Sequence, residues 1–227
     1  MHLRPRLTSI AVEELSRLLP LLYQVQLTGD MDDQRITTTS GAFRTKDVYE
    51  MLRPPSQTDE NAPVIWGTRV PNKVKIFAWL FCRNRLSTKA NLLRKCVVSE
   101  SVCSRCGAPS EDRRHVFLEC PVSKRIWDSL HVAPSLDAAE SIWSSSVPAH
   151  LDKNLWPDVL CAILWRMWEA RNNDVLRGES SDARIILTKT REDLDVWALR
   201  YKKEAHRALS RWLEYLLLCT TNYDAST

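Results

Sequence analysis

Apolar residues recur every three or four positions along most of this chain, which is the spacing of helices that bury one face. Residues 11–22 predict a short helix that ends near Pro20, and residues 46–52 predict a second one before a Pro-Pro pair. Between these two segments, residues 35–39 are β-branched and are followed by a Ser-Gly turn. This stretch predicts a minor N-terminal β element.

Two helices are predicted in the middle of the chain. The first covers residues 72–86, and the second starts after Thr88, a residue type that caps helix N-termini, and continues through Leu93. At 100° per residue, five apolar side chains of the first helix fall within one wide arc, which we expect to face the core. They are Val74, Ile76, Phe77, Leu80 and Phe81.

The last third of the chain predicts a helical hairpin. Residues 156–176 form one long apolar pattern followed by Gly178, and a further pattern starts after Ser181, which is expected to cap it, and continues to Leu216. The chain has only five glycines but nine tryptophans, a composition that favours helices over a many-stranded sandwich. The tryptophans of the hairpin fit a buried core, while an exposed stripe around Trp197 and Trp212 would instead indicate a protein partner.

These patterns predict a mostly α protein in four parts. A polar, proline-flanked linker separates the first part from a basic segment, and a stretch rich in Ser, Ala and Pro connects that segment to the hairpin. The parts are residues 1–60, with a helix, a short hairpin and a helix; 61–130, with basic helices and a cysteine cluster; 131–155, a connector; and 156–227, the C-terminal helical region.

Positive charge is concentrated in the second part. The whole chain has a formal net charge of +4, but residues 61–125 contain thirteen basic residues against four acidic ones, and no acidic residue lies between Glu60 and Glu100. A polyanion such as RNA or single-stranded DNA is the natural partner of such a segment. A solvated basic face that keeps the domain in solution explains the charge equally well.

A tryptophan lies between two cations on one predicted helix face. Lys75, Trp79 and Arg83 are four residues apart, so the ring could stack on a base while the cations hold phosphates. The more common arrangement is a packed tryptophan with Lys and Arg stems lying along it. The nucleic-acid contacts expected from this segment are Lys73, Lys75, Trp79, Arg83, Arg85 and Lys89.

The clearest chemical signal is a set of four metal-ligating residues. Cys103, Cys106, His115 and Cys120 are separated by two, eight and four residues, which suits tetrahedral zinc: a tight turn presents the first two thiolates, and the next element returns the other two ligands. Pro121 predicts that a helix starts directly after the last ligand. Four protein ligands leave no open coordination position, so the sequence predicts structural Zn²⁺ in a small zinc-stabilised helical domain.

Other chemistry has little support in the sequence. Asp30, Asp32 and Asp33 lack the glycine and glutamate of a calcium loop, and the remaining histidines accompany no nucleophile motif. There is no glycine-rich phosphate loop and no polymerase, endonuclease or ribonuclease H motif. We therefore expect no enzymatic activity. The other four cysteines are expected to be small buried apolar residues: Cys82, Cys96, Cys161 and Cys219.

The compartment follows from the cysteines and the apolar runs. Charged residues interrupt the N-terminal apolar stretch, so it does not resemble a secretory signal, and no uncharged run is long enough to cross a bilayer. Seven cysteines leave at least one thiol unpaired. We expect an intracellular protein without a membrane partner, and both the nucleus and the cytoplasm fit.

Several further motifs occur in a fixed order along the chain. They are Gly41-Ala42-Phe43, Trp66, Val70-Pro71-Asn72-Lys73-Val74-Lys75-Ile76-Phe77-Ala78-Trp79, Arg85-Leu86-Ser87-Thr88, Asn91-Leu92, His115-Val116-Phe117-Leu118-Glu119-Cys120, Trp127 and Trp168-Glu169-Ala170-Arg171-Asn172. Together they resemble the zinc-binding domain of plant reverse transcriptases from LINE-like, non-long-terminal-repeat retrotransposons. The similarity covers about residues 30–130, and the match at residues 168–172 is weaker.

The resemblance implies the same four metal ligands as the spacing, and it implies origin in a retroelement polyprotein whose module handles RNA or target DNA. The sequence thus predicts a non-catalytic zinc module that binds RNA or DNA through a basic helical face. Two alternatives remain open at this point. The chain could be a zinc-stabilised protein-interaction module that uses its C-terminal helices, or a retroelement remnant without a selected function.

Overall fold

The computed structural model describes residues 9–23, 49, 59–136 and 142–221. The chain divides into two compact units, residues 1–59 and residues 60–227. In the first unit, helix α1 (Ser9–Tyr23) has nearly the predicted range of residues 11–22, but it contains Pro20 instead of ending near it. The predicted β element at residues 35–39 and all of the predicted helix at 46–52 except Tyr49 lie outside the described residues.

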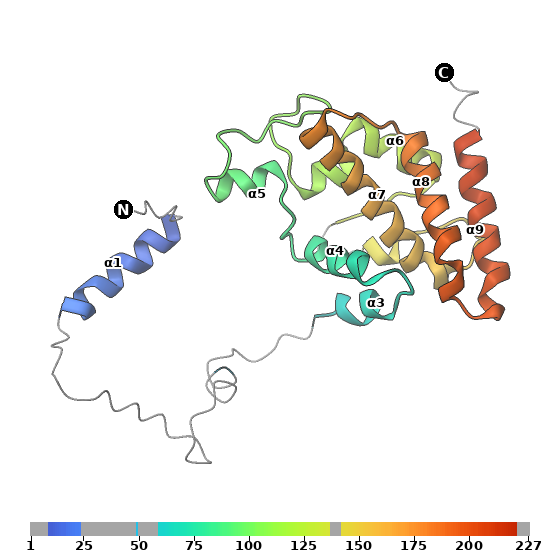
Figure 1. Cartoon of the computed structure of the whole chain (residues 1–227), viewed down its shortest axis with the longest axis horizontal. Coiled ribbons are helices and arrows are strands. Elements are labelled where there is room, and N and C mark those ends of the chain that lie inside the picture. Colours follow the sequence, from blue (N-terminus) through green and yellow to red (C-terminus); the bar gives the residue numbers. More distant parts are fainter. Residues whose placement is uncertain (1–8, 24–48, 50–58, 137–141, 222–227) are drawn as a thin grey trace, which may run out of the picture. The chain divides into compact units, whose positions relative to one another are not determined.

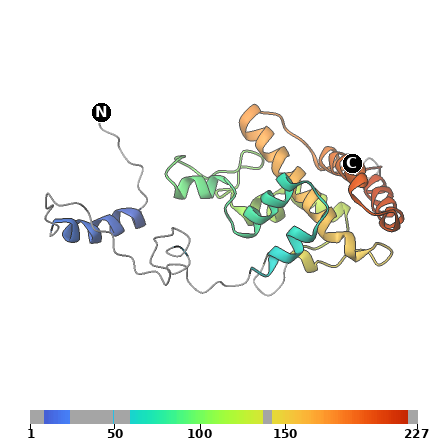
Figure 2. The ribbon, with the colours of Figure 1, turned by 60° about the horizontal axis from the view of Figure 1, so that its bottom comes forward.

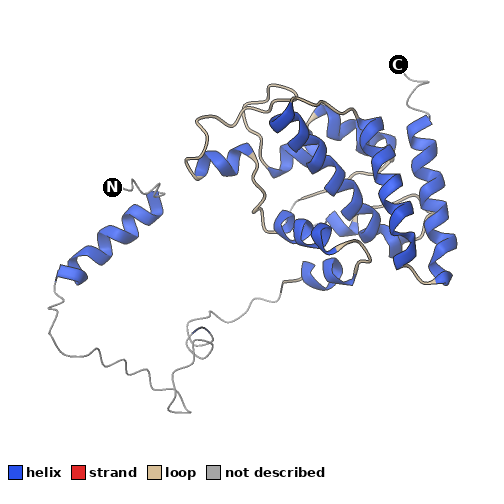
Figure 3. Cartoon of the chain, viewed as in Figure 1, coloured by secondary structure: helices blue, strands red, loops and turns tan. Residues whose placement is uncertain are grey.

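The described residues are mostly helical and include no strand (Figure 3), which confirms the prediction of a mostly α fold. The short helical turns of the second unit are η1 (His115–Glu119), η2 (Ile142–Ser144), η3 (Lys153–Leu155) and η4 (Trp197–Arg200). Its α-helices are α3 (Asn61–Gly67), α4 (Asn72–Cys82), α5 (Lys89–Arg94), α6 (Pro121–Ser129), α7 (Trp156–Arg177), α8 (Ala183–Val196) and α9 (Lys203–Thr221).

Helix α7 is the centre of the second unit. Helices α4 and α8 and the turn η1 all pack against it, and α9 packs on the far side of α8 (Figures 1 and 2). Leu160, Ile163, Leu164 and Met167 of α7 have no exposed surface. The basic segment and the C-terminal helices therefore contribute to one hydrophobic core. The division into four parts is not tested by this packing and stays a prediction.

The predicted C-terminal hairpin is confirmed, but its second arm is two helices. Gly178 ends α7 with φ of +70°, as the sequence predicts, whereas the cap of α8 is Asp182, whose side chain accepts from Ile185 N, and not Ser181. Tyr201 then adopts an extended conformation between α8 and α9. Its hydroxyl donates to Asp158 at 2.9 Å, so a tertiary contact interrupts the helical pattern.

Helix α4 is shorter than predicted and is rotated slightly in its packing. It ends at Cys82, two residues before Asn84, which has φ of +52°. The side chain of Ile76 is 50% exposed, so its expected place in the core is wrong, and Ala78 is buried instead. The buried arc of α4 is thus displaced toward Ala78, and a wide strip of the helix faces solvent.

The cysteines outside the cluster differ in their surroundings. Cys161 and Cys219 are buried, as expected, and Cys82 is half-buried. The expectation is wrong for Cys96, which is exposed in a turn with φ of +55°.

Within the described ranges, no helix combines the length and the apolar character needed to cross a membrane. The expected intracellular compartment stays a prediction.

Candidate metal centre

The first two cluster cysteines lie in a tight knuckle. The backbone N–H of Cys103 donates to Ala108 O at 2.8 Å, and the N–H of Gly107 returns to Cys103 O at 2.9 Å. Gly107 has φ of +74°, a conformation that costs energy for any residue with a Cβ. The glycine directly after Cys106 therefore allows the chain to reverse so that both thiols face one point.

The other two cluster residues are joined by the wide turn η1. The N–H of Cys120 donates to His115 O at 2.8 Å, a bond across five residues that is the mark of a π-helical turn. Asp112 holds the start of this turn by accepting from His115 N at 2.7 Å. Pro121 is the first residue of α6, which confirms the predicted helix start and places Cys120 at its N-cap.

All four possible ligand atoms lie within 4.8 Å of one another. Cys106 Sγ and His115 Nε2 are 3.3 Å apart. Zn–S bonds of about 2.3 Å and Zn–N bonds of about 2.0 Å place the donors of a tetrahedral site roughly 3.5–3.8 Å apart. Shifts of less than about 1 Å would therefore bring the four residues into zinc geometry. Three sulfurs and one imidazole are also a donor set that zinc prefers.

Burial disfavours the thiolate form of the cluster cysteines unless a positive charge lies nearby. Burial raises the pKa of Cys120 to about 11, although the N–H of Val122 acts in the opposite direction. Burial also raises the pKa of Cys103, against the effect of the backbone N–H groups of Arg105 and Cys106, and the Cys106 thiol adds to the increase. Thiolates packed this closely repel one another, and a divalent cation at their centre would reverse both effects. The donor set therefore fits a metal ion better than it fits three free thiols.

A buried ion pair that the sequence patterns did not reveal fixes the knuckle to α7. Glu111, in the loop between Cys106 and His115, is fully buried and pairs with Arg171 of α7, whose guanidinium lies 4.9 Å from the ring centre of Trp168. Two features of the sequence pointed to these residues separately: Glu111 is an acidic residue inside a basic segment, and Arg171 lies in the Trp168–Asn172 motif. No spacing rule joins residues 60 positions apart, so their pairing could not be inferred.

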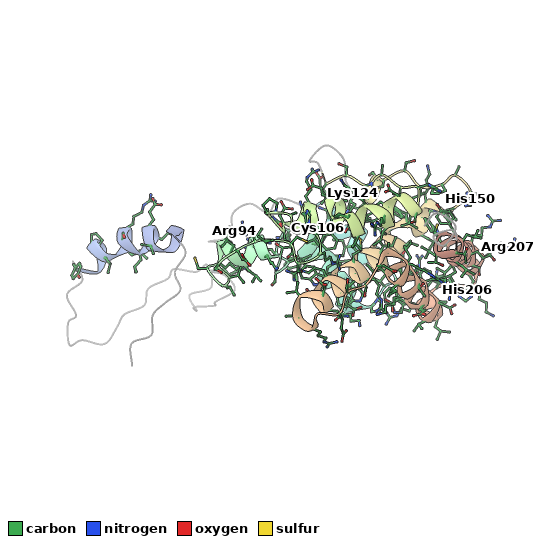
Figure 4. All side chains as sticks on the ribbon, turned by 90° about the horizontal axis from the view of Figure 1, so that it is seen from above. Arg94, Cys106, Lys124, His150, His206 and Arg207 are labelled. Carbon is green, nitrogen blue, oxygen red and sulfur yellow. The ribbon has the colours of Figure 1, made fainter. Side chains whose placement is uncertain are left out.

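Two further contacts connect the knuckle to α7. Ser104 Oγ donates to Asp174 Oδ2 at 2.8 Å, and Arg105 Nη2 donates to Met167 O at 3.4 Å. Under η1, Phe117 packs edge-on against Phe81 of α4 with ring centres 4.9 Å apart. The candidate metal centre is thus built on α4 and α7 together, and Figure 4 shows Cys106 on the Arg94 side of this unit, away from His150, His206 and Arg207.

The residues expected to contact nucleic acid do not form one uniform face. Lys73, Arg83 and Arg85 are exposed, and the Lys73 ammonium lies 5.3 Å from the ring centre of Trp165. Two lysines are half-buried: Lys75 Nζ donates to Trp66 O at 3.0 Å, and Lys89 Nζ donates to Val102 O at 2.8 Å. These lysines each keep further N–H groups for other acceptors.

Trp79 is partly buried against the core, and the guanidinium of Arg83 lies 4.7 Å from its ring centre. This is the packed arrangement that the sequence left as the more common one. Trp197 and Trp212 are 8% and 1% exposed. The exposed stripe that would have indicated a protein partner therefore does not occur at these two residues.

Comparison with known proteins supports the metal centre. Residues 43–127 match the family described as zinc-binding in reverse transcriptase. The chain is also 28% identical over 186 residues to an Arabidopsis thaliana protein named "Putative ribonuclease H protein". The match covers 75% of this chain but only 28% of that protein's length. No solved structure matches the chain.

This relative contradicts the expectation that the chain has no enzymatic activity, because its name points to a nuclease. That expectation rested on missing short motifs. Such a criterion fails because catalytic groups come from separate elements and need no fixed spacing.

Four clustered ligands, the matched domain and the plant relative agree with one another. Residues 43–127, which include the four clustered residues, are similar to the zinc-binding domain of reverse transcriptases.

Proposed function

We propose that Cys103, Cys106, His115 and Cys120 bind one structural Zn²⁺. The observation that carries this proposal is the convergence of their four donor atoms within 4.8 Å. The ion would join the knuckle, the turn η1 and the N-terminus of α6 at one point. A site closed by four protein ligands stabilises the fold instead of activating water.

We further infer that the zinc-stabilised unit binds nucleic acid through Lys73, Lys75, Arg83, Arg85 and Lys89. The charge of residues 61–125 supports this, as does the exposure of three of these five side chains. The half-buried Lys75 and Lys89 are each held at one carbonyl, which reduces the entropy lost when a phosphate binds. Contacts to phosphates alone give affinity without base specificity.

The metal centre would also support the basic segment directly. Glu111 Oε1 accepts from Lys89 N at 3.0 Å, and Glu111 O accepts from Ala90 N at 3.1 Å, so the loop between the ligands holds the first turn of α5. Loss of the ion would release this loop and with it the position of Lys89. Zinc removal should therefore weaken nucleic-acid binding even though no ligand residue touches the nucleic acid.

Fluorescence anisotropy with labelled RNA and single-stranded DNA at several salt concentrations tests the binding proposal. Five phosphate contacts predict a slope of log K against log salt of about −3.5 on single strands, and the double variant Lys75→Glu/Arg83→Glu should reduce it to about −2. The matched control is Lys202→Glu/Arg207→Glu, which makes the same charge change on exposed residues at and next to α9. Equal weakening by both variants would reduce the effect to net charge and reject a specific basic surface.

A further inference from the structure

Two large apolar side chains are exposed beside the basic residues of α4. Trp66, near the end of α3, and Ile76 of α4 are each 50% exposed. Lys75 Nζ donates to the backbone carbonyl of Trp66 at 3.0 Å, so Trp66 lies next to the first turns of α4. An exposed tryptophan is uncommon enough to suggest a binding role, particularly next to charged groups.

The exposed strip of α4 continues from Ile76 to a second indole. At 100° per residue, Ile76, Trp79 and Arg83 fall within about 60° of one another, on the side of α4 opposite the buried Ala78. Trp79 keeps part of its surface exposed, and Arg83 is stacked on its ring. Ile76 and Trp79 of α4 and Arg83 at its C-cap thus share one exposed side, and Trp66 lies near them at the end of α3. We call these four residues the indole strip.

We propose that the indole strip is a stacking platform for unpaired bases, with Trp66 as its exposed stacking residue. The inference rests on the proposed nucleic-acid binding and deepens it by selecting single strands over duplexes. Bases inside a duplex have no free face, whereas unpaired bases stack on indole rings whatever their identity.

Charge favours a nucleic acid over a protein as the occupant of the strip. Lys75 donates to the backbone carbonyl of Trp66, Arg83 stacks on the ring of Trp79, and residues 61–99 include no acidic residue. Alternation of aromatic rings with cations matches a single strand, in which bases and phosphates alternate along the chain. The same chemistry occurs in RNA and in single-stranded DNA, so the test includes both.

The deciding variant is Trp66→Ala, with Trp66→Phe as the conservative change. Half of the Trp66 surface is already exposed, so its removal should leave the fold intact, which circular dichroism would verify. The control is Leu199→Ala, a large apolar residue that is 93% exposed on η4. The probes are labelled oligouridine, oligodeoxythymidine and a hairpin duplex of equal phosphate number.

We expect Trp66→Ala to weaken binding of one or both single strands roughly 5- to 150-fold, the range for loss of one stacked base. Trp66→Phe should restore part of the affinity. Binding of the duplex should change less than two-fold, and Leu199→Ala should have no effect on any probe. The more strongly affected single strand shows whether RNA or DNA is the preferred ligand.

The outcomes separate the two proposals. Salt-dependent binding that Trp66→Ala leaves unchanged, or weakens equally on the single strands and the duplex, would overturn the stacking platform but not the basic surface. Absence of binding to all three probes by the zinc-loaded wild-type protein would overturn both.

Discussion

The buried pair of Glu111 and Arg171 should be the strongest single connection between the metal centre and α7. Both side chains are almost completely buried, at 0% and 6% exposure. Within the part of the chain that the structure describes, the second carboxylate oxygen of Glu111 has no hydrogen-bond partner. Removal of Arg171 would therefore leave a buried carboxylate without compensation, and that carboxylate would still be needed to accept from Lys89 N.

Arg171→Met should cost about 3–5 kcal/mol of unfolding free energy, the range measured when one partner of a buried ion pair is removed. Glu111→Gln should cost less, because the amide oxygen can still accept from Lys89 N, and Arg171 keeps its bond to Asn172 and its contact with Trp168. The double variant removes both charges, so it should be more stable than the sum of the two losses, with a coupling of about 1–3 kcal/mol.

Urea unfolding of the zinc-loaded protein, followed by circular dichroism, measures these values. With a denaturant slope of about 2 kcal/mol/M, the midpoint of Arg171→Met should fall by about 1.5–2.5 M. Arg166→Met supplies a comparison, because Arg166 of α7 pairs with Asp193 in a less buried setting and should cost less. Additive losses in the double variant, within about 0.5 kcal/mol, would show that Glu111 and Arg171 do not stabilise the knuckle as a pair.

Three further predictions concern the metal and the fold. Cys106→Ser or His115→Ala should each cost several kcal/mol of stability, because the free energy of metal binding at a structural site contributes directly to folding. Thermal unfolding with and without a chelator would measure this loss. A chelator that destabilises the variants and the wild type equally would contradict the prediction. Zinc binding must displace the proton of Cys120, whose pKa is raised to about 11, so zinc affinity should fall at least about ten-fold for each pH unit of acidification. The stability that zinc supplies should therefore be present at high pH and lost as pH falls. Competition with a chromogenic chelator between pH 6 and 8 measures the dependence of zinc affinity on pH, and an affinity that does not change with pH would refute the prediction. Asp182→Ala should lower the free energy of unfolding by about 1 kcal/mol, because it removes the acceptor of Ile185 N, whereas Ser181→Ala should leave it unchanged; urea unfolding measures both. A larger loss from Ser181→Ala than from Asp182→Ala would identify Ser181 as the cap.

Local chemistry made several features predictable from the sequence. Thr88 caps α5 by accepting from Asn91 N, Pro121 starts α6 and Gly178 ends α7, and each depends only on neighbouring residues. The four cluster residues were predictable for a related reason, since zinc requires particular atoms at short spacing.

Features that depend on distant residues were not predictable. The break at Tyr201 depends on Asp158, which is 43 positions away, and the pairing of Glu111 with Arg171 spans 60 positions. The exposure of Ile76 depends on how α4 is rotated against its neighbours, which a wide apolar arc does not define. In these cases tertiary contacts decided between local arrangements that the sequence pattern allowed equally.

The zinc content of the purified protein tests the central claim most directly. Elemental analysis of wild type and of Cys103→Ser/Cys106→Ser should give one zinc per wild-type chain and none in the variant, and a chelator should unfold residues 60–227 of the wild type. A wild-type protein that is folded, free of metal and equally stable with and without a chelator would contradict the account.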